Sequence, residues 1–260
     1  MMNIKWIKAA DYEVMSSIAA LRIVSVIEQN NRSGKPTHLG LATGKTMILL
    51  YSLLADMLNK REVDLTQLHT YNLDEYMSDD RCLLDIMHPL SYRRYMTENL
   101  FQGFKPDRGF NTRNINFPDP NCPEDYDRLI ADAGGLDFQL LGIGFNGHIA
   151  FNEPISEELI AAEDFAQLPT RIVGLKELTI KTNAGLAANG NTAEVPTKAI
   201  TMGMKSILET REIMLLACFE EQERPLAEIR RGRVTPYLPA SYLLKHNNST
   251  IVVSKEKIKS

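Results

Sequence analysis

The sequence predicts an α/β protein in which helices cover both faces of a doubly wound, mainly parallel sheet. Apolar runs of strand length alternate with segments of helical period, and these runs lack the two-residue alternation of a sheet with one wet face. With 260 residues, 44% of them hydrophobic, the chain can bury one large core. No repeat or low-complexity stretch indicates a second domain, so we expect residues 1–260 to form a single domain.

The elements follow one another as helix, strand, tight loop and helix, and the alternation then repeats. Apolar residues three and four apart predict an amphipathic helix over 11–29, and helices are also expected at 47–58, 91–101 and 225–231. Short apolar runs predict strands at 37–42, 67–73, 138–143, 213–217 and 250–253. Ligands of such sheets bind beyond the carboxyl ends of the strands, so functional residues are expected just after Ala42, Leu73 and Ile143.

Composition excludes several classes of partner. The chain has 29 lysines and arginines and 33 acidic residues, and its basic residues form no stripe along the sequence. Nucleic acid is therefore not expected as a binding partner. No segment approaches the roughly 20 apolar residues of a membrane span, and the N-terminus has no signal-peptide pattern, so we expect a cytoplasmic protein. Cys82, Cys122 and Cys218 are widely spaced and odd in number, which predicts reduced thiols, with Cys218 buried. Four of the five histidines lack metal-ligand spacing, so neither a metal nor a cofactor is predicted.

The loop after the first strand is a candidate anion site. Thr43, Gly44, Lys45 and Thr46 lead into a helix, so backbone N–H groups and the helix N-terminus point at one place. Phosphate is the natural occupant, although turns also use glycine for backbone reasons alone. A nucleotide P-loop is disfavoured, because its first glycine would have to stand one residue before Gly40.

Two adjacent carboxylates, Asp74 and Glu75, follow the strand at 67–73. A partly desolvated acid at a strand end can act as a general base. The alternative is that Asp74 caps a helix while Glu75 is solvated, because Asp is common at such junctions. The residues alone leave both interpretations open.

The strongest signal follows the strand at 138–143, where glycines 142, 144 and 147 surround Asn146 and precede His148 and Glu153. Glycines let a backbone approach a ligand closely, and a nearby carboxylate can fix the tautomer of an imidazole and raise its basicity. A lone histidine is more often structural, but this setting favours a catalytic role for His148.

Four segments together resemble the glucosamine-6-phosphate deaminase (glucosamine/galactosamine-6-phosphate isomerase) family in order and spacing. They are LGLATG at 39–44, NLDEY at 72–76, HPLSY at 88–92 and GFNGHIAFNEP at 144–154. VTP at 234–236 and PAS at 239–241 are similar to the closing elements of that family. The resemblance implies a Rossmann-like sheet, and family members are often homo-oligomers.

The resemblance also implies a reaction that needs no nucleotide or metal. An amino-sugar 6-phosphate, of glucosamine or galactosamine, opens, becomes a ketose phosphate and loses ammonia. By similarity, His148 takes the proton of the anomeric hydroxyl, Glu153 orients His148, Asn146 helps to place them, and Asp74 moves the C2 proton to C1. Residues 43–46, Glu75 and Gly147 are then expected to contact the substrate.

Two positions depart from the family. Gly185 and Gln222 stand where an arginine and a lysine bind the phosphate, and Lys45 is the candidate replacement. The departures leave open a sugar-phosphate lactonase or a non-catalytic sugar-phosphate sensor. Neither alternative needs the full set of Asp74, His148 and Glu153. The glycines and polar residues of 165–191 would permit a mobile lid.

Overall fold

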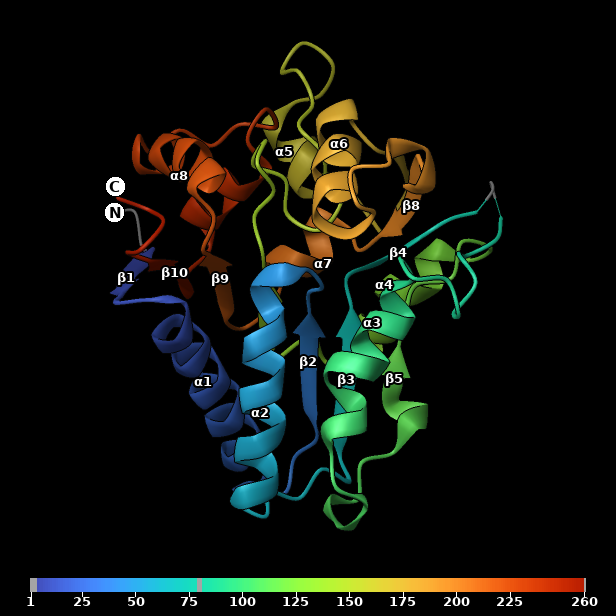
Figure 1. Ribbon diagram of the computed structural model, residues 1–260, viewed down its shortest axis with the longest axis vertical. Coiled ribbons are helices and arrows are strands. Elements are labelled where there is room, and N and C mark those ends of the chain that lie inside the picture. The colour runs from blue at the N-terminus through green and yellow to red at the C-terminus, as the bar shows by residue number, and fades with distance from the viewer. Residues whose placement is uncertain (1–3, 79–80, 260) are drawn as a thin grey trace.

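A seven-stranded parallel sheet forms the centre of the computed structural model, which describes residues 4–78 and 81–259 (Figure 1). Each neighbouring pair of strands is parallel, which confirms the predicted mainly parallel sheet. The order is β1 (Lys5–Ala9), β10 (Ser249–Ser254), β9 (Ile213–Ala217), β6 (Phe138–Leu141), β2 (Thr37–Leu41), β3 (Leu68–Asn72) and β5 (Ile115–Asn116).

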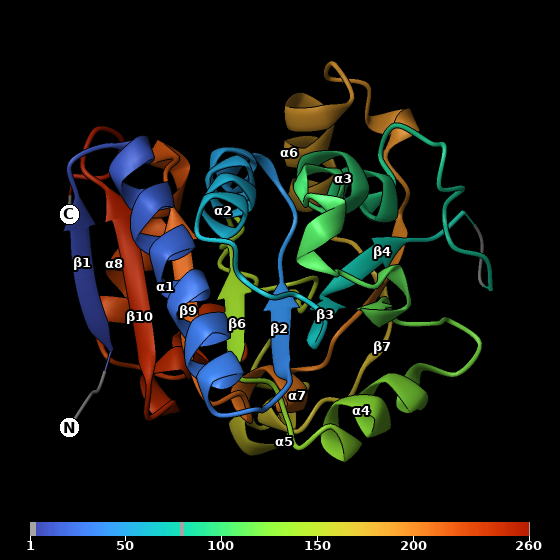
Figure 2. The same ribbon diagram turned by 90° about the horizontal axis from the view of Figure 1, so that it is seen from below.

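Helices lie on both sides of this sheet, with α1, α2 and α3 on one side and α4, α5 and α7 on the other (Figure 2). Their bounds are α1 Tyr12–Arg32, α2 Ile48–Lys60, α3 Tyr92–Asn99, α4 Pro123–Asp132, α5 Ala162–Ala166, α6 Glu177–Ala187, α7 Met204–Leu208 and α8 Glu223–Arg230. The long first helix begins after Asp11, whose carboxylate accepts from the N–H of Val14 as an N-cap. No helix in the described ranges combines the length and the apolar character needed to cross a membrane.

The expected strand at 67–73 is in fact followed at once by a strand of a second sheet. After β3 the chain turns at Leu73 and forms β4 (Asp74–Tyr76), which pairs antiparallel with β8 (Lys198–Thr201). β7 (Arg171–Gly174) completes this three-stranded sheet. The sequence did not predict it, because its strands have only three or four residues. Because β4 begins directly after β3, its first residue, Asp74, lies at the boundary between the two sheets.

Candidate active site

A cavity lies beyond the carboxyl ends of β2, β3 and β6, on the side where α6 stands in Figure 1. The three segments expected to carry function therefore meet in one place. Of the predicted site residues, seven line the cavity: Thr43, Gly44, Lys45, Thr46, Asp74, Asn146 and His148. Three others, Glu75, Gly147 and Glu153, lie behind its wall.

The loop after β2 forms one side of the cavity and runs through a short 3-10 turn, Lys45–Met47, into α2. Gly44 has a φ of 115°, a backbone conformation that glycine adopts far more readily than other residues. The side chain of Lys45 is exposed at the same wall. Loop and lysine together present positive charge and N–H donors, as an anion requires.

Asp74 is the first residue of β4 and faces the cavity while only 5% of its surface remains exposed. Within the described part of the chain its carboxylate has no hydrogen-bond donor. Burial, and then the neighbouring charge of Glu75, raise the pKa of Asp74 well above its usual value. A carboxylate that is desolvated and unpaired is a stronger base than one in water, which suits the removal of a proton from carbon.

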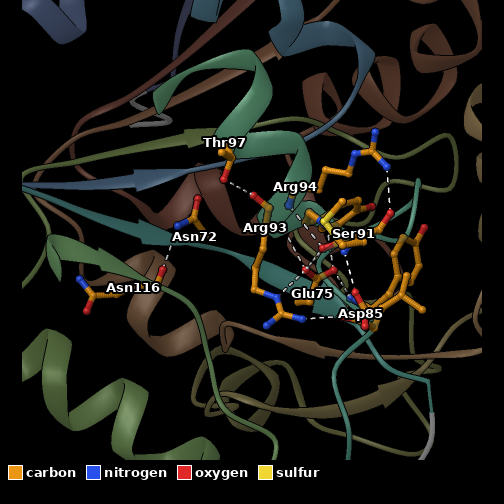
Figure 3. A network of polar contacts seen from close by, with 12 residues as sticks. Asn72, Glu75, Asp85, Ser91, Arg93, Arg94, Thr97 and Asn116 are labelled. Carbon is orange, nitrogen blue, oxygen red and sulfur yellow. Dashed lines mark hydrogen bonds and ion pairs between the residues drawn. The ribbon is translucent and has the colours of Figure 1, made fainter. Parts of the chain in front are cut away.

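Glu75 does not line the cavity and is fully buried against the N-terminus of α3, beside Ser91 and Arg93 (Figure 3). Its Oε2 accepts from the Ser91 hydroxyl and the Arg93 N–H, each at 2.9 Å, and its Oε1 accepts from the Tyr92 N–H at 2.9 Å. Arg93 also pairs with it through Nε at 3.3 Å. These donors occupy both oxygens of Glu75, and its direct contact with a substrate stays a prediction.

The structure contradicts the alternative in which Asp74 caps a helix while Glu75 is solvated. Glu75, which follows Asp74 directly, is the residue that satisfies a helix terminus, and it is buried. The same helix start carries Tyr92, whose ring lines the cavity and lies 4.9 Å from that of Tyr76. Glu75 thus fixes a wall of the cavity without touching its interior.

Asn146 stands between His148 and Glu153 and joins them. Its Nδ2 donates to Glu153 Oε2 at 2.7 Å, and its Oδ1 lies 2.8 Å from His148 Nδ1. The direct distance from His148 Nδ1 to Glu153 Oε2 is 3.6 Å, too long for a good hydrogen bond. Thr179 of α6 lies 3.5 Å from both Nδ1 and Asn146 Nδ2. The predicted pair of His148 and Glu153 is therefore connected mainly through the side-chain amide of Asn146.

This chain of contacts defines the protonation of the imidazole. Burial raises the pKa of Glu153, but attraction to His148 and hydrogen bonds from Thr179 and Asn146 outweigh it and lower the pKa to about 2. Ionised Glu153 can only accept, so the amide nitrogen of Asn146 faces it and the amide oxygen faces His148. Nδ1 therefore donates to Asn146 Oδ1, and in the neutral imidazole this tautomer leaves the lone pair on Nε2. His148 is thus prepared to act as a base through Nε2.

Two glycines make room for this arrangement. A Cβ on Gly144 would lie 2.2–2.5 Å from atoms of the His148 ring, so the imidazole packs directly on that backbone. Gly147 has a φ of 87°, and a Cβ there would meet Leu238 at 2.2 Å. Gly147 therefore shapes the turn from behind the residues that line the cavity, and its substrate contact stays a prediction.

We expect Gly144→Ala to lower turnover about 100-fold while the protein stays folded, because the new methyl would push the imidazole by about 1 Å. Gly174→Ala is the matched control, since a Cβ there meets nothing within 4 Å. Steady-state kinetics and melting temperatures of both variants make the comparison. An alanine variant of Gly144 with normal turnover would contradict the close packing of this ring.

The structure also explains the two positions that lack the expected cations. Gln222 is buried, and its Oε1 accepts from the N–H groups of Cys218 and Phe219 at 2.8 and 2.9 Å. Its Nε2 donates to the carbonyl of Ile143 at 2.7 Å, so this side chain joins the segments that follow β6 and β9. Gly185 is exposed on α6 and does not line the cavity. Cys218 is half-buried, less than expected.

Sequence reasoning missed the contribution of α6, whose residues Leu178, Thr179, Thr182, Asn183 and Leu186 line the cavity. Their spacing places them on one helical face, a signal that could have been read from the sequence. The predicted lid, 165–191, contains α6 and β7, and its mobility stays a prediction. Among residues 4–78 and 81–259, no three His, Cys, Asp or Glu side chains gather as ligands of a metal would.

Known proteins resemble the whole chain. A model of the family described as glucosamine-6-phosphate isomerases/6-phosphogluconolactonase matches residues 10–252. A glucosamine-6-phosphate deaminase of Clostridium botulinum (strain Loch Maree) is 39% identical over 255 residues, covering 95% of this chain and 94% of that protein. One from Clostridium acetobutylicum is 36% identical over 263 residues, covering 98% and 99%.

Solved structures agree with this assignment. The structure of a monomeric glucosamine-6-phosphate deaminase superimposes with a TM-score of 0.85 and 30% identity, covering 98% of both chains. A 6-phosphogluconolactonase from Trypanosoma brucei shares the fold, with a TM-score of 0.73 and 18% identity over 98% of both chains. The chain belongs to the family of glucosamine-6-phosphate isomerases and 6-phosphogluconolactonases.

Proposed function

We propose that this protein converts an amino-sugar 6-phosphate, glucosamine or galactosamine 6-phosphate, into a ketose 6-phosphate and ammonia. The observation that carries the proposal is a cavity faced by two different bases. One is the imidazole of His148, prepared as a base at Nε2, and the other is the buried, unpaired carboxylate of Asp74. An aldose-to-ketose conversion needs both, the first at oxygen and the second at carbon.

Ring opening is the task of His148. Its Nε2 takes the proton of the anomeric hydroxyl while the ring oxygen gains a proton, and the C1–O5 bond breaks to give the aldehyde. The positive charge that develops on the imidazole is stabilised by ionised Glu153 through the amide of Asn146. The net change at this step is a proton moved from one oxygen to the other.

Asp74 then acts on the open chain. Its carboxylate takes the proton from C2 and returns it to C1, while one proton passes from the amine nitrogen to O1, so the 2-amino aldehyde becomes a 2-imino sugar with a hydroxyl at C1. One water adds to C2, and ammonia leaves to give the ketose 6-phosphate. Burial of Asp74 favours this step, since the transfer relieves the cost of a desolvated charge.

The phosphate is assigned to the loop at 43–46 with Lys45 as its cation. Among the described residues that line the cavity, Lys45 is the one lysine or arginine, and the N–H groups of the loop lie beside it. Such a charged contact is worth roughly 1.5–3 kcal/mol, enough to matter where Gly185 and Gln222 bring no charge.

Lys45→Gln should raise KM for the sugar phosphate about 10- to 100-fold with a smaller effect on kcat, because the phosphate lies away from the reacting carbons. Lys181→Gln is the control, since Lys181 pairs with Glu177 on α6 and lies outside the cavity. Initial rates over a range of substrate concentrations separate the two parameters. Equal KM values in both variants would remove Lys45 from the phosphate site.

A second candidate is hydrolysis of a sugar-phosphate lactone, because the family includes 6-phosphogluconolactonases. The relatives of this chain at 36–39% identity are called deaminases, whereas the lactonase of Trypanosoma brucei is only 18% identical, which favours deamination. The proposal further includes action in the cytoplasm as part of amino-sugar catabolism, and assembly into a homo-oligomer.

Ammonia release tests the proposal. Purified protein is incubated with glucosamine 6-phosphate, galactosamine 6-phosphate and the same sugars without phosphate. Release from one phosphorylated sugar is expected, and it names the substrate. Release from none, together with hydrolysis of 6-phosphogluconolactone, would establish the lactonase alternative. Tight binding of a sugar phosphate without turnover of either substrate would establish a sensor.

A further inference from the structure

We propose that three tyrosines, Tyr12, Tyr51 and Tyr95, are positioning residues that keep the N–H groups of the loop at 43–46 turned into the cavity. They come from three different helices, α1, α2 and α3. The inference rests on the proposed function in one respect: it takes the phosphate of the substrate as the ligand of this loop.

Each tyrosine hydroxyl donates to a different carbonyl at the start of the loop. Tyr51 donates to the carbonyl of Ala42, Tyr95 to that of Gly44 at 2.7 Å, and Tyr12 to that of Lys45 at 3.1 Å. Three of the four consecutive carbonyls from Ala42 to Lys45 are therefore held from outside.

Because each peptide unit is planar and trans, the direction of a carbonyl also fixes the direction of the N–H group that follows it. In such a peptide the C=O and the following N–H point in opposite directions. Carbonyls held by the tyrosines therefore turn the N–H groups of Thr43, Lys45 and Thr46 away from the tyrosines. In the ranges described, these three amides donate no hydrogen bond within the protein, and all three residues line the cavity. They are free to donate to an anion.

The peptide after Gly44 is restrained from two directions, because its carbonyl accepts from the N–H of Met47 at 2.9 Å within the short 3-10 turn and from the hydroxyl of Tyr95. Gly44 has a φ of 115°, and a Cβ added to it would meet no atom within 4 Å, so sterics oppose rotation there only weakly. A rotated peptide between Gly44 and Lys45 would place a carbonyl oxygen where the anion binds and would repel it. Hydrogen bonds from the tyrosines favour the state with N–H groups inward.

The tyrosines are themselves fixed in place. Tyr51 is fully buried, and its ring meets that of Tyr95 edge-on at 6.5 Å. The Tyr12 hydroxyl also accepts from the N–H of Leu49 at 3.2 Å, which ties the loop to the first turn of α2. A donor on a rigid ring has little freedom to follow a moving carbonyl, so the geometry of the loop is set by three packed helices.

The test uses Tyr12→Phe, Tyr51→Phe and Tyr95→Phe in the full-length chain. Affinity for inorganic phosphate is measured by calorimetry, and KM and kcat are measured with glucosamine 6-phosphate. We expect phosphate to bind about 3- to 10-fold more weakly to each variant, with KM raised to a similar extent and kcat changed less than about twofold.

Tyr242→Phe is the matched control, because Tyr242 is also buried and its hydroxyl donates to a carbonyl, that of Ala162, outside the loop. It should lose stability but keep its phosphate affinity. The inference is overturned if every loop variant that folds has the phosphate affinity of the wild type, or if the wild type does not bind phosphate. Wild-type protein that binds phosphate but releases no ammonia contradicts the proposed function alone. Tyr12 and Tyr95 carry the test if the Tyr51 variant does not fold.

Discussion

Asp74→Asn should abolish ammonia release and at the same time make the folded protein more stable at neutral pH. The amide cannot take the C2 proton, and a general base contributes about 100- to 10,000-fold to such a step. The amide keeps the shape of the side chain, so binding of the sugar phosphate should change little. Turnover lost with binding retained is the signature of a base that acts on the substrate.

The gain in stability follows from the raised pKa of Asp74. In the unfolded chain this carboxyl ionises near 3.8, whereas in the folded protein burial, and then Glu75, raise its pKa well above that value. As the pH rises from 3.8 through the folded pKa, ionisation in the native state costs stability that the neutral amide does not lose. The melting temperature of the variant should therefore exceed that of the wild type above this window and match it below pH 3.8.

Melting curves and rate profiles over a range of about pH 3–9 make the measurement. In the wild type, kcat/KM should fall as the pH drops through the raised pKa, because the base becomes protonated. Asp132→Asn on the surface of α4 is the control and should leave both rate and stability unchanged. An active Asp74→Asn variant would falsify the assignment of the base.

Glu153→Gln should lower kcat/KM about 100-fold or more, because the new side chain has no charge to balance the imidazolium of His148. Its amide would also bring a donor against the N–H of Lys176, which now donates to Glu153 Oε1 at 3.2 Å. The substituted side chain would then hold Asn146, and through it Nδ1 of His148, less firmly. The loss should appear in ring opening and be smaller for a substrate already in its open form.

The pH dependence of stability gives a second readout for Glu153. Its folded pKa of about 2 lies below the ordinary 4.5, so its contribution is fully present above pH 4.5 and is lost as the pH falls through about 2. The variant should be less stable than the wild type by on the order of 2 kcal/mol near about pH 6, with the gap closing in acid. Glu158→Gln, on the neighbouring exposed loop, is the control. A pH-independent gap would mean that Glu153 acts through packing and not through charge.

The sheet and most of the site could be predicted because both depend on local patterns. Apolar strands followed by glycine-rich turns predict where a parallel sheet ends, and those ends brought Lys45, Asp74 and His148 to one cavity. The break at Leu73 was not predictable in the same way. From Thr70 to Met77 every residue is buried, so no change in pattern marks the passage from one sheet to the other.

Glu75 and Gln222 show a second limit. The contacts of Glu75 depend on a helix that starts 17 residues later, and the position of Glu75 beside Asp74 gives no sign of that partner. At Gln222 the sequence reveals a missing lysine but not the three hydrogen bonds that bury the amide. Contacts between distant segments decide both cases, and a single sequence carries no local signal for them.

The passage of the chain from β3 into β4 has a consequence for the size of the sugar. Asp74 belongs to the small sheet through its pairing with Thr201, whereas the loop that ends in Lys45 extends from the large sheet. A substrate held by its phosphate on one sheet must present C2 to a carboxylate on the other. Under the proposed function we therefore expect the two sheets to select for chain length: the C2 of a phosphorylated amino sugar one carbon shorter or longer would lie out of register with Asp74.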